Sequence, residues 1–106
     1  MVETKFSNNV LTAYLSGEID HDSAAQIRVR VDGMAQELKP GLLCLDFGGV
    51  SFMDSSGIAI VIHTLRAMEE LEGEVWLSNI PPQPMKVLRA AGIEKLVRLG
   101  AERSPA

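Results

Sequence analysis

A short apolar run near the middle of the chain constrains the fold more than any other feature. Residues 42–47 read Leu-Leu-Cys-Leu-Asp-Phe, a stretch that is almost continuously apolar and too short for a buried helix. Runs of this kind are typical of strands that are buried on both faces of a parallel sheet. The run therefore predicts a strand at the centre of a sheet.

The residues before this run show first a strand pattern and then a helix pattern. Apolar residues alternate over residues 5–17, and the Asn8-Asn9 pair within them predicts a hairpin turn. Helical spacing follows Ser23, where Gln26 completes a capping-box pattern, and Pro40-Gly41 ends the predicted helix. The first half of the chain is thus predicted to form a hairpin, a helix and the central strand.

The second half of the chain continues this alternation. A second helical pattern covers residues 58–68 and ends near Gly73, and residues 74–78 predict another strand. Pro84 is expected to begin a short helix, and residues 93–99 to form a last edge strand. Alternating strands and helices need crossover connections. The predicted fold class is therefore α/β, a small mixed and mostly parallel sheet of four to five strands with helices packed on it.

Length and composition set the broad class of the protein. We expect the 106 residues to form a single domain, residues 1–106, with a core over about residues 3–99 and a short tail over residues 100–106. No apolar run approaches the roughly 20 residues that span a bilayer, and the first residues lack the order of a secretory signal. The single cysteine, Cys44, cannot form an intrachain disulfide. These features predict a cytoplasmic protein without a membrane segment.

The net charge also bears on possible partners. A formal charge of −4 argues against nucleic acid as a partner, since binding to phosphates needs clustered lysine and arginine. A protein with basic patches is a better match for this chain.

Hydroxyl and carboxylate side chains concentrate in the segment that follows the central strand. Asp54-Ser55-Ser56-Gly57 precedes the second helical pattern, and Asp and Ser are the preferred N-cap residues of helices. One interpretation is therefore purely structural. The other rests on position, because the carboxyl ends of parallel strands hold the sites of open α/β folds and a helix N-terminus favours an anion. The residues by themselves leave both interpretations open.

The sequence offers little support for catalysis, metal binding or nucleotide binding by this chain alone. The Gly-x-Ser-x-Gly pattern of many serine hydrolases is absent, and the candidate bases His21 and His63 fall beside a helix cap and inside a helix. Cys44 and the two histidines do not have metal-ligand spacing, and Gly48-Gly49 lacks the phosphate-loop pattern. We therefore predict no catalytic residue, no metal and no cofactor, with a serine hydrolase kept as a remote alternative.

The remaining hypothesis is that another protein modifies a serine of this segment. Phosphorylation of Ser55 would add about −1.5 to −2 charges at a helix N-terminus, where an anion is favoured by roughly 0.3–1 kcal/mol. Asp54 beside it would make the modified surface strongly negative without unfolding the domain. A partner that packs over Ser55 would then be expelled.

Three segments of the sequence resemble a known family. Gly17-Glu18-Ile19-Asp20, the strand Leu43-Cys44-Leu45-Asp46-Phe47, and Val50-Ser51-Phe52-Met53-Asp54-Ser55-Ser56-Gly57-Ile58 are similar to the STAS domain of bacterial anti-sigma factor antagonists. The resemblance extends from the first strand to about Leu99. It departs from the family at the end of the chain, where Gly100 to Ala106 is too short for the C-terminal helix common in the family.

The resemblance implies a phosphorylation switch. An anti-sigma factor, which is a serine kinase that uses ATP, holds a sigma factor inactive; the unmodified antagonist binds the kinase and frees the sigma factor. Phosphorylation blocks this binding, and a phosphatase reverses it. Matched residue by residue, Ser55 is the phosphate acceptor, and Asp20, Asp54, Ser56 and Gly57 are the expected contacts with the kinase. Such a protein is not an enzyme.

An alternative keeps the fold and drops the switch. The chain would then be a STAS scaffold subunit of a transport or signalling complex, in which Ser55 only caps a helix and is not phosphorylated.

Overall fold

The computed structural model describes residues 1–100, and for residues 98–100 it describes the backbone alone. Of the predicted tail, residues 100–106, only Gly100 lies within the described residues, where it ends β5. In chain order the elements are β1 (Val2–Ser7), β2 (Val10–Ile19), α1 (His21–Leu38), β3 (Leu42–Met53), α2 (Ser56–Glu70), β4 (Glu74–Ser78), α3 (Pro82–Ala90), a short 3₁₀ helix (Ile93–Lys95) and β5 (Arg98–Gly100).

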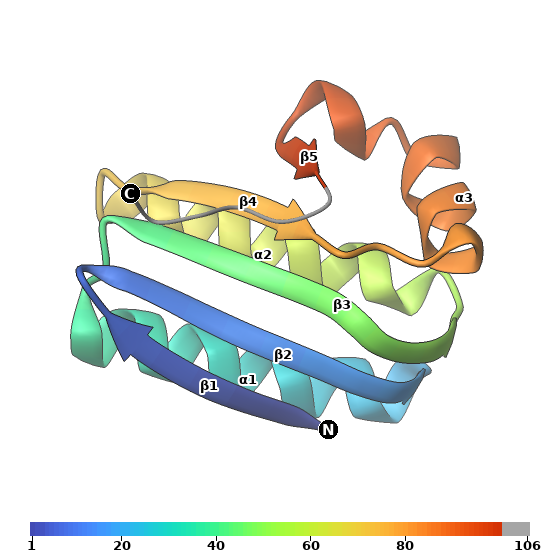
Figure 1. Ribbon diagram of the computed structural model, residues 1–106, viewed down its shortest axis with the longest axis horizontal. Helices are drawn as coiled ribbons and strands as arrows, with labels where there is room; N and C mark the ends of the chain where they lie inside the picture. The colour runs from blue at the N-terminus through green and yellow to red at the C-terminus, as the bar shows by residue number, and fades with distance from the viewer. Residues whose placement is uncertain (101–106) are drawn as a thin grey trace.

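The described strands form one sheet in the order β1-β2-β3-β4-β5 (Figure 1). β1 pairs with β2 antiparallel through the hairpin, and the remaining neighbours pair parallel. Asn8 and Asn9 both take positive φ in the hairpin turn, as the sequence predicted. The prediction of a small, mostly parallel α/β sheet is therefore confirmed, with β3 at its centre.

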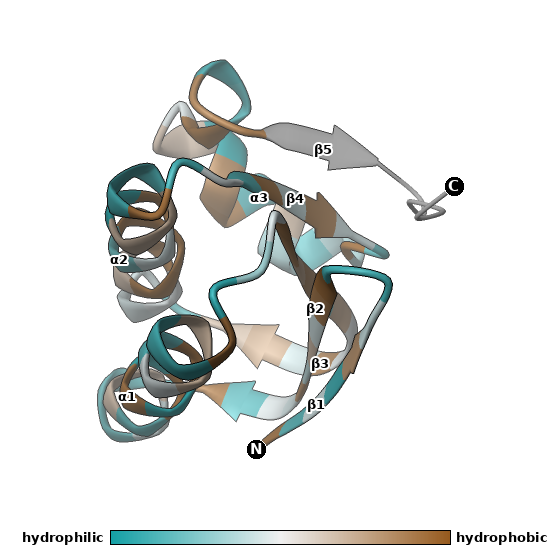
Figure 2. Cartoon of the chain, turned by 90° about the vertical axis from the view of Figure 1, so that its left-hand side faces the viewer, coloured by the Kyte–Doolittle hydropathy of each residue, from teal (hydrophilic) through white to brown (hydrophobic). Residues whose placement is uncertain are grey.

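Helices α1 and α2 lie side by side on one face of the sheet (Figure 2). Both helices connect neighbouring parallel strands, and because such crossovers share one handedness they bring both helices to the same face. The core forms between this face and the two helices. Its fully buried side chains come from the central strands and from the inner sides of both helices, and they include Leu43, Leu45, Phe47, Ile27, Val31, Ile60 and Val61.

Helix α1 begins earlier than its sequence pattern indicated. Asp20 is the N-cap, and its carboxylate accepts a hydrogen bond from the Ser23 N–H at 2.9 Å. The Ser23 hydroxyl in turn accepts from the Asp20 N–H at 2.9 Å, so Ser23 is the third helical residue of the capping box. The prediction that Ser23 and Gln26 form the capping box was wrong. Asp20 is the better N-cap because β2 continues up to Ile19 and delivers the chain directly to it.

Strand β3 is twice as long as the apolar run predicted, because it continues through Gly48 and Gly49 to Met53. A Cβ atom at Gly49 would lie 3.0 Å from the Leu15 carbonyl oxygen and 2.9 Å from the Ser16 Cβ of β2. Glycine therefore permits a close approach of the two strands where their register shifts. The extra length carries β3 to the sheet end where β2 also stops.

The last elements differ from prediction in two respects. Helix α3 begins at Pro82, with Pro81 as its N-cap, and not at Pro84. Residues 93–95 form a 3₁₀ helix, so only residues 98–100 remain for the edge strand β5. Pro81, Pro82 and Pro84 all suit the first turn of a helix, so the local rule does not choose among them.

Candidate functional site

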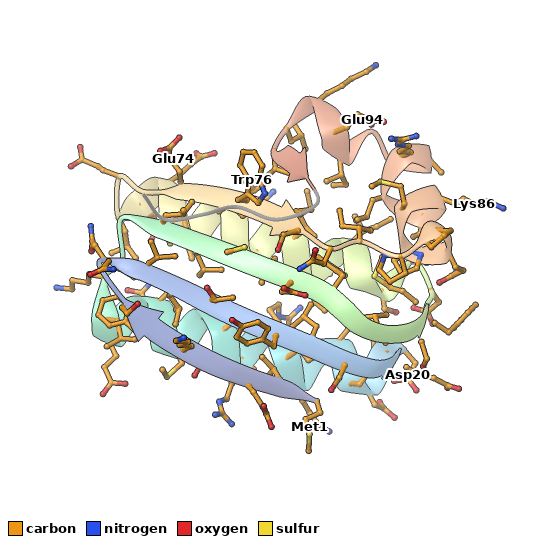
Figure 3. The ribbon with its side chains drawn as sticks, in the orientation of Figure 1. Met1, Asp20, Glu74, Trp76, Lys86 and Glu94 are labelled. Atoms are coloured by element: carbon orange, nitrogen blue, oxygen red, sulfur yellow. The ribbon has the colours of Figure 1, made fainter. Side chains whose placement is uncertain are left out.

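Two acidic residues follow the adjacent ends of β2 and β3. Ile19 and Met53 are register partners at the last pair of the two parallel strands. The Asp54 N–H donates to the Ile19 carbonyl oxygen at 3.0 Å, which joins the two strand ends directly. Asp20 and Asp54 therefore leave the sheet side by side, one entering α1 and the other entering α2. Figure 3 shows Asp20 at this end of the sheet.

The first turn of α2 is capped by Asp54 and not by the serine after it. The Asp54 Oδ1 accepts a hydrogen bond from the Ser56 N–H at 2.8 Å. Ser55 occupies the N-cap position in a helical conformation and forms no side-chain capping bond, and its side chain is exposed. The capping interpretation of the serine hydroxyl is thus contradicted by the geometry. Ser55 presents its hydroxyl to solvent at the positive end of a helix of 15 residues.

Gly57 allows the helix start to pack closely on the end of β3. A Cβ atom at Gly57 would overlap the side chain of Met53, which is fully buried. The absence of a side chain here lets α2 begin directly over Met53. Gly57 itself is buried in this contact. The contact places the start of α2, and with it Ser55, at the end of β3.

Gln83 of α3 supports the same turn from the other side. Its amide oxygen accepts from the Met53 N–H at 2.8 Å, and its amide nitrogen donates to the Met53 carbonyl oxygen at 2.7 Å. Both backbone groups of Met53 are therefore satisfied by one side chain, just before the turn that bears Ser55. Sequence reasoning missed this residue. Its signal was a single amide side chain among Pro81, Pro82 and Pro84, which gives no indication of its distant partner.

Asp20 carries a negative charge that its surroundings favour. The hydrogen bond from the Ser23 backbone N–H is the main cause that lowers the pKa of the Asp20 carboxyl below its ordinary value of 3.8, followed by the bond to the Ser23 side chain. The carboxylate is exposed and ionised at neutral pH, although it also caps α1. Asp20 can therefore contact a partner from a fixed position.

One large apolar side chain is exposed close to the serine in sequence. Phe52 is 49% exposed and pairs in register with Glu18 near the end of the two strands. An aromatic ring that is half open to solvent beside polar groups is a common anchor of protein interfaces. In the sequence, Phe52 was notable only as part of the segment from Val50 to Ile58 that resembles the family. The residue pattern of β3 did not predict that its ring would be exposed.

Of the two histidines, His63 lies away from Ser55. His63 is exposed two turns further along α2, and its Nε2 lies 3.5 Å from the Arg28 Nη1 of α1. His21 is exposed at the first position of α1. Over residues 1–100, no three His, Cys, Asp or Glu side chains gather closely enough to hold a metal ion. No helix within the described part of the chain has the length and apolar content to cross a membrane.

The geometry makes a specific prediction about the two neighbouring residues. Asp54→Ala is expected to lower the free energy of unfolding by about 1 kcal/mol, since it removes the hydrogen bond to the Ser56 N–H. Ser55→Ala should change it by less than about 0.5 kcal/mol, because Ser55 forms no capping bond. Denaturant unfolding of both variants measures the difference. A larger loss for Ser55→Ala would assign the cap to Ser55.

One family model matches nearly the whole chain. The model for the STAS domain matches residues 1–105. The chain belongs to the STAS domain family. The family resemblance predicted from three segments is therefore confirmed over nearly the whole chain.

Similar proteins with established names include anti-sigma factor antagonists. An anti-sigma F factor antagonist from Lysinibacillus sphaericus is 33% identical over 79 residues, which cover 74% of this chain and 68% of that protein. One from Paenibacillus polymyxa is 26% identical over 91% of this chain and 82% of that protein. The anti-sigma-B factor antagonist of Bacillus subtilis is 25% identical over 95% of this chain and 91% of that protein.

Solved STAS structures superpose well on this one. The anti-sigma factor antagonist SpoIIAA in its unphosphorylated form has a TM-score of 0.82 at 26% identity, with 96% of this chain and 90% of that chain covered. The Bacillus SpoIIAA in its phosphorylated form has a TM-score of 0.74 at 26% identity, with 96% and 93% covered. An anti-sigma factor antagonist from Mycobacterium paratuberculosis shares the fold, with a TM-score of 0.86 at 20% identity over 96% and 86%.

Proposed function

We propose that this STAS protein is an anti-sigma factor antagonist controlled by phosphorylation of Ser55. In the unmodified state it binds an anti-sigma factor that is also a serine kinase, and the sigma factor is released. The kinase supplies ATP and phosphorylates Ser55, and a partner phosphatase removes the phosphate. The protein itself carries out no catalytic step and needs no cofactor.

The observation that carries this proposal is the free position of the Ser55 hydroxyl. Ser55 is exposed at the N-terminus of α2, and Asp54 supplies the cap that a serine in this position would otherwise provide. A hydroxyl that serves no structural bond can be modified without loss of stability. The helix N-terminus also favours the added negative charge. A related protein that is known in phosphorylated and unphosphorylated forms is consistent with this use.

The surface around Ser55 suggests how the partner would be held. We assign the kinase contact to Asp20 and Asp54, which leave the ends of adjacent strands, and to Ser56 at the helix start, whereas Gly57, which is buried against Met53, would support this start from below. Phe52, which is half exposed, would add an apolar anchor to this polar surface. A phosphate at Ser55 would lie next to Asp54 within this contact. The resulting negative charge would oppose any partner surface complementary to the neutral serine.

Mass analysis after incubation with the cognate kinase and ATP tests the proposal. One phosphate per chain is expected, and peptide mapping should place it on Ser55. Ser55→Ala should take up no phosphate, whereas Ser56→Ala should still be modified, which separates the two neighbouring hydroxyls. A phosphate that maps elsewhere, or none at all, would remove the switch and favour a scaffold role for the same fold.

A further inference from the structure

A recessed surface lies at the end of α2 opposite to Ser55. It is a groove of about 450 Å³ between the last turns of α2, the start of β4 and the segment that follows α3. This volume is within the range of about 300–1,000 Å³ that is usual for binding pockets. Helix α2 has 15 residues and is therefore about 20 Å long. The groove is separated from Ser55 by most of that length.

The floor of this groove is apolar and partly open to solvent. It is lined by Leu65 of α2, Val75 of β4, and Leu96 and Val97 beyond the 3₁₀ helix. Leu96 is 59% exposed, although it stands beside other apolar side chains. A partner that covers an exposed leucine in such a setting removes apolar surface from water, which stabilises the complex.

Within residues 1–100, no strand pairs with the first residues of β4 on the side of β5. β5 pairs with Trp76, Leu77 and Ser78, so the described part of β5 does not reach the first residues of β4. Glu74 and Val75, which line the groove, therefore lie on an edge that β5 does not cover. A bound segment could approach the backbone here as well as the side chains.

The rim of the groove is acidic. Among the residues whose side chains the structure describes, Glu69, Glu74 and Glu94 line it together with Lys95, which leaves a net charge of −2 for these four. The last turn of α2 contains no basic residue, so the negative end of the helix dipole adds to this field. Figure 3 shows Glu74 and Glu94 along the same edge of the molecule. The described residues of the groove therefore combine an apolar floor with a rim of net negative charge.

We propose that this groove docks a basic amphipathic segment of a partner protein. Apolar side chains of the segment would cover Leu96 and its neighbours, and lysine or arginine side chains would approach the three glutamates. Charge complementarity selects this occupant. A second copy of the chain would bring a protein of net charge −4 to an acidic rim, and nucleic acid would be repelled by it.

This contact goes beyond the proposed switch, because it lies away from the modified residue. Charges separated by about 20 Å in water are largely screened at physiological ionic strength. Occupation of the groove should therefore be independent of phosphorylation at Ser55. The domain would then keep one partner bound while the opposite end of α2 exchanges another.

The test uses a synthetic amidated peptide of lysine and leucine with helical amphipathic spacing, titrated into the ¹⁵N-labelled full chain. Amide shifts are expected around Leu65, Val75 and Leu96. The double variant Glu69→Lys/Glu94→Lys should bind at least tenfold more weakly than the original chain. The matched control Glu3→Lys/Glu37→Lys makes the same change in net charge at exposed positions outside the groove, and should bind within about twofold. Leu96→Ser should also weaken binding.

Several outcomes would overturn the proposal. Equal losses in both double variants would show attraction to net charge alone. Shifts outside the groove, or equal binding of a peptide with glutamate in place of lysine, would exclude the acidic rim as the determinant. A dimer in light scattering that Leu96→Ser dissociates would assign the groove to a second copy. Ser55→Asp should bind the peptide as the original chain does, so failure of the switch leaves this result unaffected.

Discussion

Ser55→Asp is expected to bind the anti-sigma factor kinase at least thirtyfold more weakly than Ser55→Ala. The aspartate places a fixed carboxylate next to Asp54, at the centre of the proposed contact. A charge left unpaired in a buried interface costs about 2–5 kcal/mol, and 2 kcal/mol corresponds to roughly thirtyfold in affinity. Ser55→Ala should bind as tightly as the unmodified protein and stay bound in the presence of ATP. Calorimetric titration of the kinase with each variant measures the ratio.

A charge placed elsewhere provides the control for this experiment. Ser7 is exposed at the hairpin end of β1, at the opposite end of the sheet from Ser55. Ser7→Asp makes the same change in net charge and should bind within about twofold of the original chain. Equal affinities of the Asp and Ala variants at position 55 would contradict expulsion by charge. A similar loss from Ser7→Asp would show that overall charge and not position is sensed.

Gln83→Ala is expected to lower the free energy of unfolding by about 2–4 kcal/mol. The substitution leaves the Met53 N–H and carbonyl oxygen without their partners in a partly buried place. Each unsatisfied backbone group costs about 1–3 kcal/mol, and the total is a large fraction of the 5–15 kcal/mol that stabilises a typical domain. Chemical denaturation followed by circular dichroism measures the loss.

Two further variants make this prediction specific. Gln83→Glu can still accept from the Met53 N–H but cannot donate to the carbonyl oxygen while ionised. Its free energy of unfolding should therefore lie between those of the original chain and Gln83→Ala. Gln26→Ala on the exposed surface of α1 should change stability by less than about 0.5 kcal/mol. A loss at position 83 no larger than at position 26 would mean that these bonds do not support the turn.

These two predictions concern one structural arrangement. The exposed Ser55 stands on a turn whose backbone is joined to β2 through Ile19 and to α3 through Gln83. A partner that reads the state of one hydroxyl needs that hydroxyl in a fixed position. The bonds around Met53 and Asp54 provide it, while the hydroxyl itself takes no part in them.

The sequence determined the features that depend on neighbouring residues. The apolar run at residues 42–47 predicted the central strand, the Asn8-Asn9 pair predicted the hairpin, and the alternation of patterns predicted a mostly parallel sheet. These predictions succeeded because burial of a strand and the positive φ of a turn leave a local trace in residue type. The choice of Ser55 over Ser56 as the phosphate acceptor came from the family resemblance, and it stays a prediction.

Only the tertiary structure decided the features that join distant segments. Ser23 satisfied the local rule for an N-cap, yet Asp20 caps α1 because β2 extends to Ile19. Gly49 continues β3 because β2 approaches it closely, and Gln83 bonds to Met53 across 30 positions of sequence. A hydrogen bond between elements so far apart imposes no periodicity on either segment, so the sequence pattern carries no sign of it.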